Sequence, residues 1–184
     1  MLCSTAADPE CAAFAASSNV GDVGASTRDI SKVDYCSSVL AGVSGTQQKR
    51  LQSVHNAAAR RIFSGRRSEH ITPLLRELHW LKVHERIQFR LCVLAYRCLH
   101  DTAPTYLASS LHLTTENKGH RRLRSADTMT LSVPATRRST LGDRAFPVAA
   151  ARAWNSLPAT TRSALSIDVF RRQLKTFLFE KSFH

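Results

Sequence analysis

The sequence lacks the features of a secreted, disulfide-bonded or membrane-spanning protein. It contains only 5 Cys in 184 residues, and no two of them form a C-x-x-C pair. An odd number of scattered cysteines argues against a disulfide scaffold and indicates a reducing compartment. The N-terminus has no basic segment ahead of an apolar run, and no window approaches the roughly 18 apolar residues of a membrane span. We therefore expect an intracellular protein, cytoplasmic or nuclear, that is neither secreted nor inserted in a membrane.

Motifs that carry catalysis are also missing. No two Asp residues are adjacent, so the paired carboxylates with which a polymerase palm holds Mg²⁺ are absent. The sequence has no phosphate-binding G-x-x-x-x-G-K-[ST] loop, no G-x-S-x-G elbow and no H-E-x-x-H zinc motif. Cys92, Cys98 and His100 come nearest to a metal-binding group, but buried thiols and a surface imidazole are the simpler interpretation. We expect no enzymatic activity, no cofactor and no metal site.

Positive charge is what the sequence has in excess. The chain contains 26 Lys and Arg against 14 Asp and Glu, a formal net charge of +12 at pH 7. Residues 1–46 carry two basic and five acidic side chains, a net charge of −3, whereas residues 47–184 carry 24 basic and nine acidic ones, a net charge of +15. A surplus of this size favours a polyanionic partner, either nucleic acid or anionic lipid.

The hydrophobic pattern predicts a small, mainly helical domain behind a flexible leader. With only 7 Gly and 6 Pro, the chain is neither collagen-like nor of low complexity. Residues 1–33 are small, polar and aperiodic, so we expect them to be disordered. Residues 34–184 form the predicted domain, with five or six helices. Helical patterns, some only a turn long, occupy residues 46–62, 73–78, 83–100, 103–107, 147–154 and 166–178.

In the 46–62 helix, the pattern places Leu51, Val54, Ala58 and Ile62 on the buried face, and Gly65 is the expected stop. In the 83–100 helix, the expected buried stripe is Val83, Ile87, Leu91, Leu94 and Cys98, with Glu85, Arg86, Arg90 and Arg97 facing solvent. Trp154 is expected in the core, and residues 155–158 are expected to end the helix before them.

A basic, irregular segment interrupts the helical pattern between residues 112 and 142. Residues 128–134 alternate polar and apolar side chains, which suits an extended segment and leaves room for a short β-hairpin. Together with the basic residues of the 46–62 helix and its C-terminal flank, this segment supplies the expected phosphate contacts. The expected contact residues are Arg60, Arg61, Arg66, Arg67, Lys118, Arg121, Arg122, Arg124, Arg137, Arg138 and Arg144. For Arg60 and Arg61, which lie in the predicted helix, a solvated helix face with no binding role is the alternative interpretation.

Several segments of the sequence, taken in order, resemble those of a known protein family. Residues 34–42 read DYCSSVLAG, residues 51–60 read LQSVHNAAAR and residues 70–81 read HITPLLRELHWL. In this order they resemble the DYCNSLLxG, LQxVQNAAAR and HITPxLRELHWLPV segments of Jockey-like non-LTR retrotransposon polyproteins, which follow the reverse transcriptase domain. His55 stands where that family usually has glutamine, and Lys82 where it has proline. The resemblance continues through residues 94–100, 103–107, 142–146, 154–158 and 170–179.

The resemblance implies that residues 34–184 are the C-terminal region of a retrotransposon-encoded RNA-directed DNA polymerase. The endonuclease and the polymerase fingers and palm would be absent. Because the catalytic carboxylates of the family lie upstream, none corresponds to a residue here. The resemblance also implies a helical appendage whose basic surface holds RNA or DNA without sequence specificity. Residues 1–33 match none of the family segments.

Several hypotheses remain open from the sequence. The favoured one is a catalytically inactive fragment that binds RNA or DNA non-specifically. The second is a helical module that docks onto a protein partner. The apolar helix faces at residues 51–62 and 170–178 would pack either on each other or on the missing thumb, and in the latter case they would be exposed to a partner. A decayed retroelement copy with no cellular role is the third, and an active reverse transcriptase would need carboxylates that the sequence does not show. The sequence leaves the oligomeric state undetermined.

Overall fold

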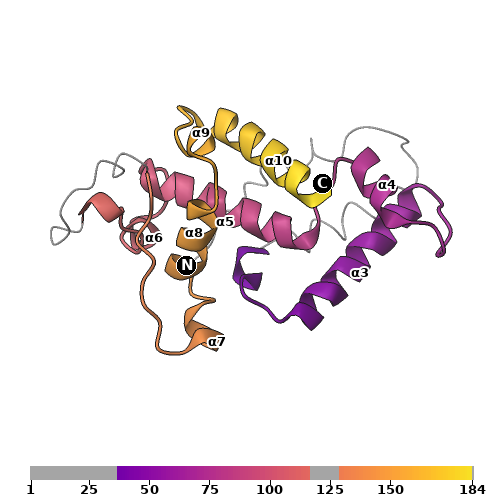
Figure 1. Ribbon diagram of the computed structural model, residues 1–184, viewed down its shortest axis with the longest axis horizontal. Coiled ribbons are helices and arrows are strands. Elements are labelled where there is room, and N and C mark those ends of the chain that lie inside the picture. Colours follow the sequence, from indigo (N-terminus) through magenta and orange to yellow (C-terminus); the bar gives the residue numbers. More distant parts are fainter. Residues whose placement is uncertain (1–36, 117–128, 184) are drawn as a thin grey trace.

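The computed structural model describes residues 37–116 and 129–183, and over these residues the chain is mainly helical (Figure 1). The predicted mainly helical fold is confirmed, whereas the predicted leader, residues 1–33, lies outside the described residues. None of the described helices is long and apolar enough to cross a membrane. In chain order the elements are η1 (Ser37–Leu40), α3 (Gly45–Ile62), α4 (Ile71–Glu77), α5 (Val83–Leu99), α6 (Thr105–Ala108), η2 (Thr114–Glu116), α7 (Ser139–Gly142), α8 (Phe146–Asn155), α9 (Ala159–Arg162) and α10 (Ile167–Phe183).

Helix ends follow local chemistry that the sequence only partly revealed. Ser44 caps α3, because its Oγ accepts a hydrogen bond from the backbone N–H of Gln47 at 3.4 Å. At the other end, the helix stops close to Gly65, as predicted, but Gly65 is not the left-handed residue. Ser64 has φ 51° instead, and the N–H of Gly65 donates to the carbonyl of Arg60 at 2.8 Å. This is the Schellman pattern with serine in the position that glycine usually takes.

Helix α5 is the central element and packs against η1, α3, α6, α8 and α10. Val83, Ile87 and Leu91 are buried as predicted, but so are residues on other sides of the helix. Arg86, predicted to face solvent, is only 8% exposed. Its Nε donates to the carbonyl of Leu81 at 3.2 Å. The prediction failed because a helix covered on several sides buries more than one stripe.

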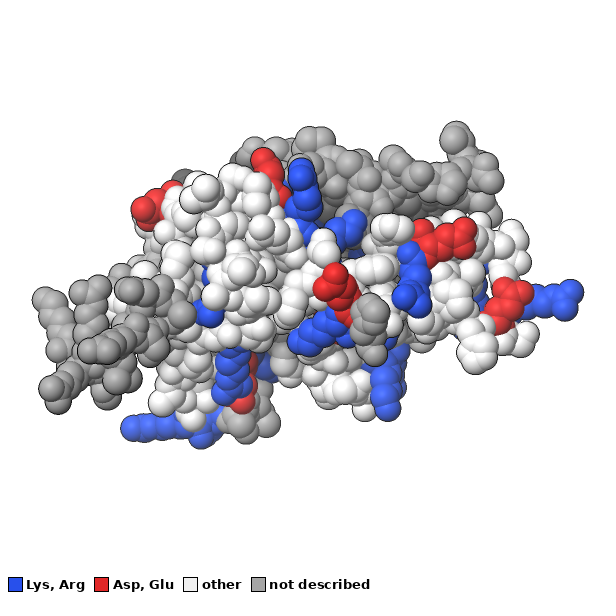
Figure 2. Space-filling model, turned by 45° about the horizontal axis from the view of Figure 1, so that its top comes forward, with Lys and Arg blue, Asp and Glu red and all other residues white. Residues whose placement is uncertain are grey.

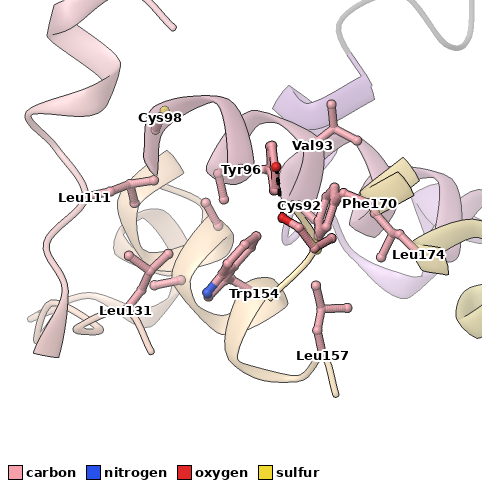
Figure 3. Packing of buried hydrophobic residues seen from close by; sticks show 14 of the residues in the cluster. Cys92, Val93, Tyr96, Cys98, Leu111, Leu131, Trp154, Leu157, Phe170 and Leu174 are labelled. Carbon is pink, nitrogen blue, oxygen red and sulfur yellow. Dashed lines mark hydrogen bonds between the residues drawn. The ribbon is translucent and has the colours of Figure 1, made fainter. Parts of the chain in front are cut away.

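The main core lies where α8 and α10 meet α5 (Figure 3). The rings of Tyr96 and Phe170 stack with centroids 4.6 Å apart, and Trp154 packs at 5.6 Å from Phe170. The expectation that Trp154 is a core residue is confirmed, since it is fully buried. Phe170, Leu174 and Leu178 are also fully buried. Helix α10 therefore uses this face to pack within the chain, against α5.

A second core cluster joins α3 to α4 and to the residues that precede α5. Ala58, Ala59, Leu75 and Trp80 form it, and His55 lies beside it with 2% exposure. Val54, which the pattern had placed on the buried face, is 51% exposed. His55 occupies the buried side of α3 instead, where its ring packs against Trp80 at a centroid distance of 5.0 Å.

The extended segment is held by backbone hydrogen bonds to residues 112–114 on one side and by side chains of α8 on the other. Leu131 forms one isolated antiparallel bridge with Leu113, and the described residues contain no strand. Asn155 accepts from the N–H of Leu131 at 2.9 Å and donates to its carbonyl at 2.8 Å. Because this amide satisfies both backbone groups, Leu131 needs no second strand. The expected hairpin is thus reduced to a bridge in the described residues, and residues 117–128 lie outside them.

Short helical turns appear where the sequence predicted none. Helix α7 and the turn η2 lie within residues 112–142, which the sequence predicts to be irregular. Helix α9 follows Pro158 directly, and residues 155–158 had been expected only to end the preceding helix. These turns are four residues or fewer, too short to show a hydrophobic period.

Candidate nucleic-acid interface

The solvent-facing side of α3 carries basic residues and no acidic ones. Within its 18 residues the helix has four Lys or Arg and no Asp or Glu. Lys49, Arg50 and Arg61 are exposed, and Arg60 is half-buried. Ion pairs on a helix form between residues three or four apart, and α3 supplies no carboxylate at those spacings. The positive charge of this face is therefore not cancelled within the helix.

This face has cations at both ends and small side chains between them. Five exposed residues lie on one side of the helix at positions i, i+3, i+4, i+7 and i+11, namely Arg50, Ser53, Val54, Ala57 and Arg61. Lys49 stands beside the first of these and Arg60 beside the last. At a rise of 1.5 Å per residue, the two basic pairs are about 16 Å apart along the helix axis.

The C-terminal flank of α3 extends the second basic end. Arg66 and Arg67 are exposed in the connection to α4. Arg60 holds this connection in place, because its Nη2 donates to the backbone carbonyl of Glu69 at 3.4 Å. The sequence-predicted residues Arg60, Arg61, Arg66 and Arg67 thus gather at one end of one helix.

A second basic group surrounds α7. Arg137, Arg138 and Arg144 are exposed, and Arg144 lies against the turn that leads into α3. A Cβ at Gly42 would come within 2.6 Å of Arg144 Cγ, and Gly42 has φ 68°. Residue 42 therefore has to be glycine for two reasons, its left-handed backbone and this close approach. Arg144 joins the α7 group to the N-terminal end of α3.

An ion pair organises the chain between α7 and α8. Arg152 Nη2 lies 3.1 Å from Asp143 Oδ1, and the hydroxyl of Thr136 donates to the same oxygen at 3.0 Å. The hydrogen bonds from Arg152 and Thr136 lower the pKa of Asp143 below its ordinary value. Arg152, which the sequence did not select, therefore serves the local structure, and its charge is compensated.

The predicted site residues do not form one patch. In the α7 group, Arg144 lies against the turn before α3, whereas Arg60, Arg61, Arg66 and Arg67 lie at the other end of this helix, which is about 27 Å long. On the face drawn in Figure 2, Lys and Arg side chains are dispersed among uncharged atoms and interrupted by Asp and Glu. Lys118, Arg121, Arg122 and Arg124 lie outside the described residues. Each of the two basic groups nevertheless includes residues that lie next to α3.

Lys49 and Arg50 are not among the predicted contact residues, although one feature of the sequence indicates that they belong to a basic face. No acidic residue occurs between Asp34 and Glu69. A long acid-free stretch that includes an amphipathic helix marks a basic face more specifically than a local density of arginines does. The structure adds that both side chains are exposed.

This chain matches no protein-family model, no curated protein and no solved structure. The resemblance to retrotransposon segments accordingly stays a prediction from the sequence.

The cysteines and histidine considered for metal binding lie in different surroundings. Cys92 and Cys98 are buried in the main core, and burial raises the pKa of both thiols. The exposed ring of His100 stacks on Tyr96 with centroids 4.1 Å apart. Across residues 37–116 and 129–183, no three His, Cys, Asp or Glu side chains are grouped as a metal would require.

Proposed function

We propose that the chain is a catalytically inactive fragment of an RNA-directed DNA polymerase from a Jockey-like non-LTR retrotransposon, and that it binds RNA or DNA without sequence specificity. The observation that carries the binding proposal is the exposed face of α3, where basic residues stand with no carboxylate of the helix to neutralise them. The family origin is supported by the ordered series of sequence segments in residues 34–184.

Electrostatics supplies both the affinity and the lack of specificity. Each Lys or Arg that contacts a phosphate releases condensed counterions, so the binding constant falls as salt rises, with a slope of about −0.9 per contact on duplex DNA. Phosphates carry no sequence information, and so such contacts position a protein without reading bases. Arg50, Arg61, Arg66 and Arg144 are exposed residues that this process would use.

The proposal is tested by measuring affinity against salt. Fluorescence anisotropy with the full chain should give a linear fall of log K with log salt on labelled RNA and DNA oligonucleotides of unrelated sequence. Four to six phosphate contacts predict a slope of about −4 to −5. The proposal fails if the chain does not bind at 50 mM salt, if affinity ignores salt, or if phosphatidylserine vesicles bind more tightly than nucleic acid.

The absence of catalysis belongs to the same proposal and has its own test. A primer-extension assay with template RNA, Mg²⁺ and all four deoxynucleotides should show no incorporation above buffer alone. Incorporation that disappears when one acidic residue of the purified chain is replaced would refute the proposal.

A further inference from the structure

The exposed face of α3 differs between its ends and its middle. Its central positions, Ser53, Val54 and Ala57, carry small side chains, and its ends carry Arg50 and Arg61. Small residues let a backbone approach the helix closely, while long cationic side chains reach past it on either side.

The opposite face of α3 fixes the helix in one orientation. Gln52 Oε1 accepts from the N–H of Val83 at 2.8 Å, and Gln52 Nε2 donates to Asn56 Oδ1 at 2.8 Å. His55 and Ala59 are buried against the second core cluster. Because the helix is held before any partner arrives, little ordering entropy is lost when its exposed face binds.

The spacing of the cations fits a duplex groove. The two basic pairs are about 16 Å apart along the axis, and the major groove of B-form DNA is about 12 Å wide. A helix laid across this groove places each pair about 2 Å beyond a groove edge, over the phosphates of one strand. The minor groove of DNA, about 6 Å wide, is too narrow for this spacing, and the major groove of an RNA duplex is deep and narrow. The wide, shallow minor groove of duplex RNA is the alternative that the duplex RNA probe below tests.

The composition of α3 argues against single strands. Proteins that bind single-stranded nucleic acid stack successive bases on aromatic side chains. Helix α3 contains no Phe, Tyr or Trp. Its exposed face can contact phosphates but has no ring on which an unpaired base would stack.

Resting on the proposed nucleic-acid binding, we infer that α3 is the docking element, that its partner is duplex DNA, and that the helix crosses the major groove with one basic end on each strand. The residues that set this arrangement are the exposed Arg50 and Arg61, with the exposed Lys49 beside Arg50. Ala57 marks the closest approach between helix and groove.

The experiment compares two double variants of equal charge in the full chain. Arg50→Gln with Arg61→Gln removes one cation from each end of the α3 face, and Arg172→Gln with Lys181→Gln removes two exposed cations from α10. On a 20-base-pair DNA duplex, the α3 variant should bind about tenfold more weakly with a salt slope reduced by about 2, whereas the α10 variant changes affinity less than about twofold. Circular dichroism checks that both fold.

A third variant and two further probes complete the test. Ala57→Glu, which keeps every cation but places a carboxylate at the centre of the face, should weaken duplex binding about as much as the α3 double variant. Wild-type chain should bind duplex DNA at least about tenfold more tightly than single-stranded DNA or duplex RNA. Equal losses for the α3 and α10 variants, or no preference for duplex DNA, would overturn the inference while leaving the proposed function standing. Absence of all binding at 50 mM salt would overturn the proposed function itself.

Discussion

At the scale of single residues, His55 has the most unusual surroundings. Its ring is buried beside Trp80, and among the described residues neither ring nitrogen has a hydrogen-bond partner. Burial, and then the positive charge of Arg86, lowers the pKa of His55 from 6.5 to about 3. The imidazole is therefore neutral in the folded protein at any pH where the protein is ordinarily studied.

This depressed pKa predicts acid destabilisation. Because the folded pKa lies below the unfolded value, the contribution of His55 to stability is complete above pH 6.5 and is lost as pH falls toward 3. At pH 4.5 the loss should be about 2 to 3 kcal/mol. Urea unfolding at pH 7.5 and 4.5 measures it, with His55→Gln as the control.

The control isolates His55 from the carboxylates, such as Asp143, that also titrate in acid. Glutamine cannot gain a proton in this range, so the variant should lose about 2 to 3 kcal/mol less than wild type between the two pH values. Equal losses in both proteins would show that His55 does not cause the pH dependence.

At the scale of elements, the sequence predicted the long helices well and the connections poorly. Repeated apolar positions located α3, α5 and α10, because a long helix repeats its pattern several times. The segment after residue 128 has no such repetition. Its conformation depends on Asn155, an amide 24 residues away from Leu131 in the chain, and no local pattern reveals a partner at that distance.

Removing this amide should loosen the extended segment specifically. Asn155→Ala leaves the N–H and carbonyl of Leu131 without their partner, and the expected cost is about 1 to 3 kcal/mol of unfolding free energy. Hydrogen exchange should become faster at the Leu131 amide while amides in the middle of α5 keep their protection. Asn155→Asp, which keeps the acceptor and loses the donor, should have a smaller effect on that amide. Unchanged exchange at Leu131 would contradict this role for Asn155.

The candidate site could be predicted only in part, for a related reason. Charge counting could group Arg60, Arg61, Arg66 and Arg67, because they are close in sequence. The sequence did not indicate that Arg144 would lie against Gly42, since that contact depends on how α7 approaches the turn before α3. It also placed Val54 inward and so concealed the exposed face of α3.

At the scale of the whole molecule, stability depends on the packing of α10 against α5. Phe170 is fully buried between Tyr96 and Trp154, whereas its neighbour Val169 is 42% exposed. Phe170→Ala should lower the unfolding free energy by about 3 to 5 kcal/mol, which is a large fraction of the total for a domain of this size. Val169→Ala should cost about 0.5 kcal/mol or less. Thermal and urea unfolding would test both, and similar costs would contradict the packing described here.

The central position of α5 has a consequence for a chain cut between residues 116 and 129. The described residues on the N-terminal side of such a nick contain α5, and those on the C-terminal side contain α8 and α10, which pack on it. Neither piece has a complete core alone, so co-expressed halves should reassemble and elute together from a sizing column. Each half would then bury the apolar surface that the other half exposes when it is alone.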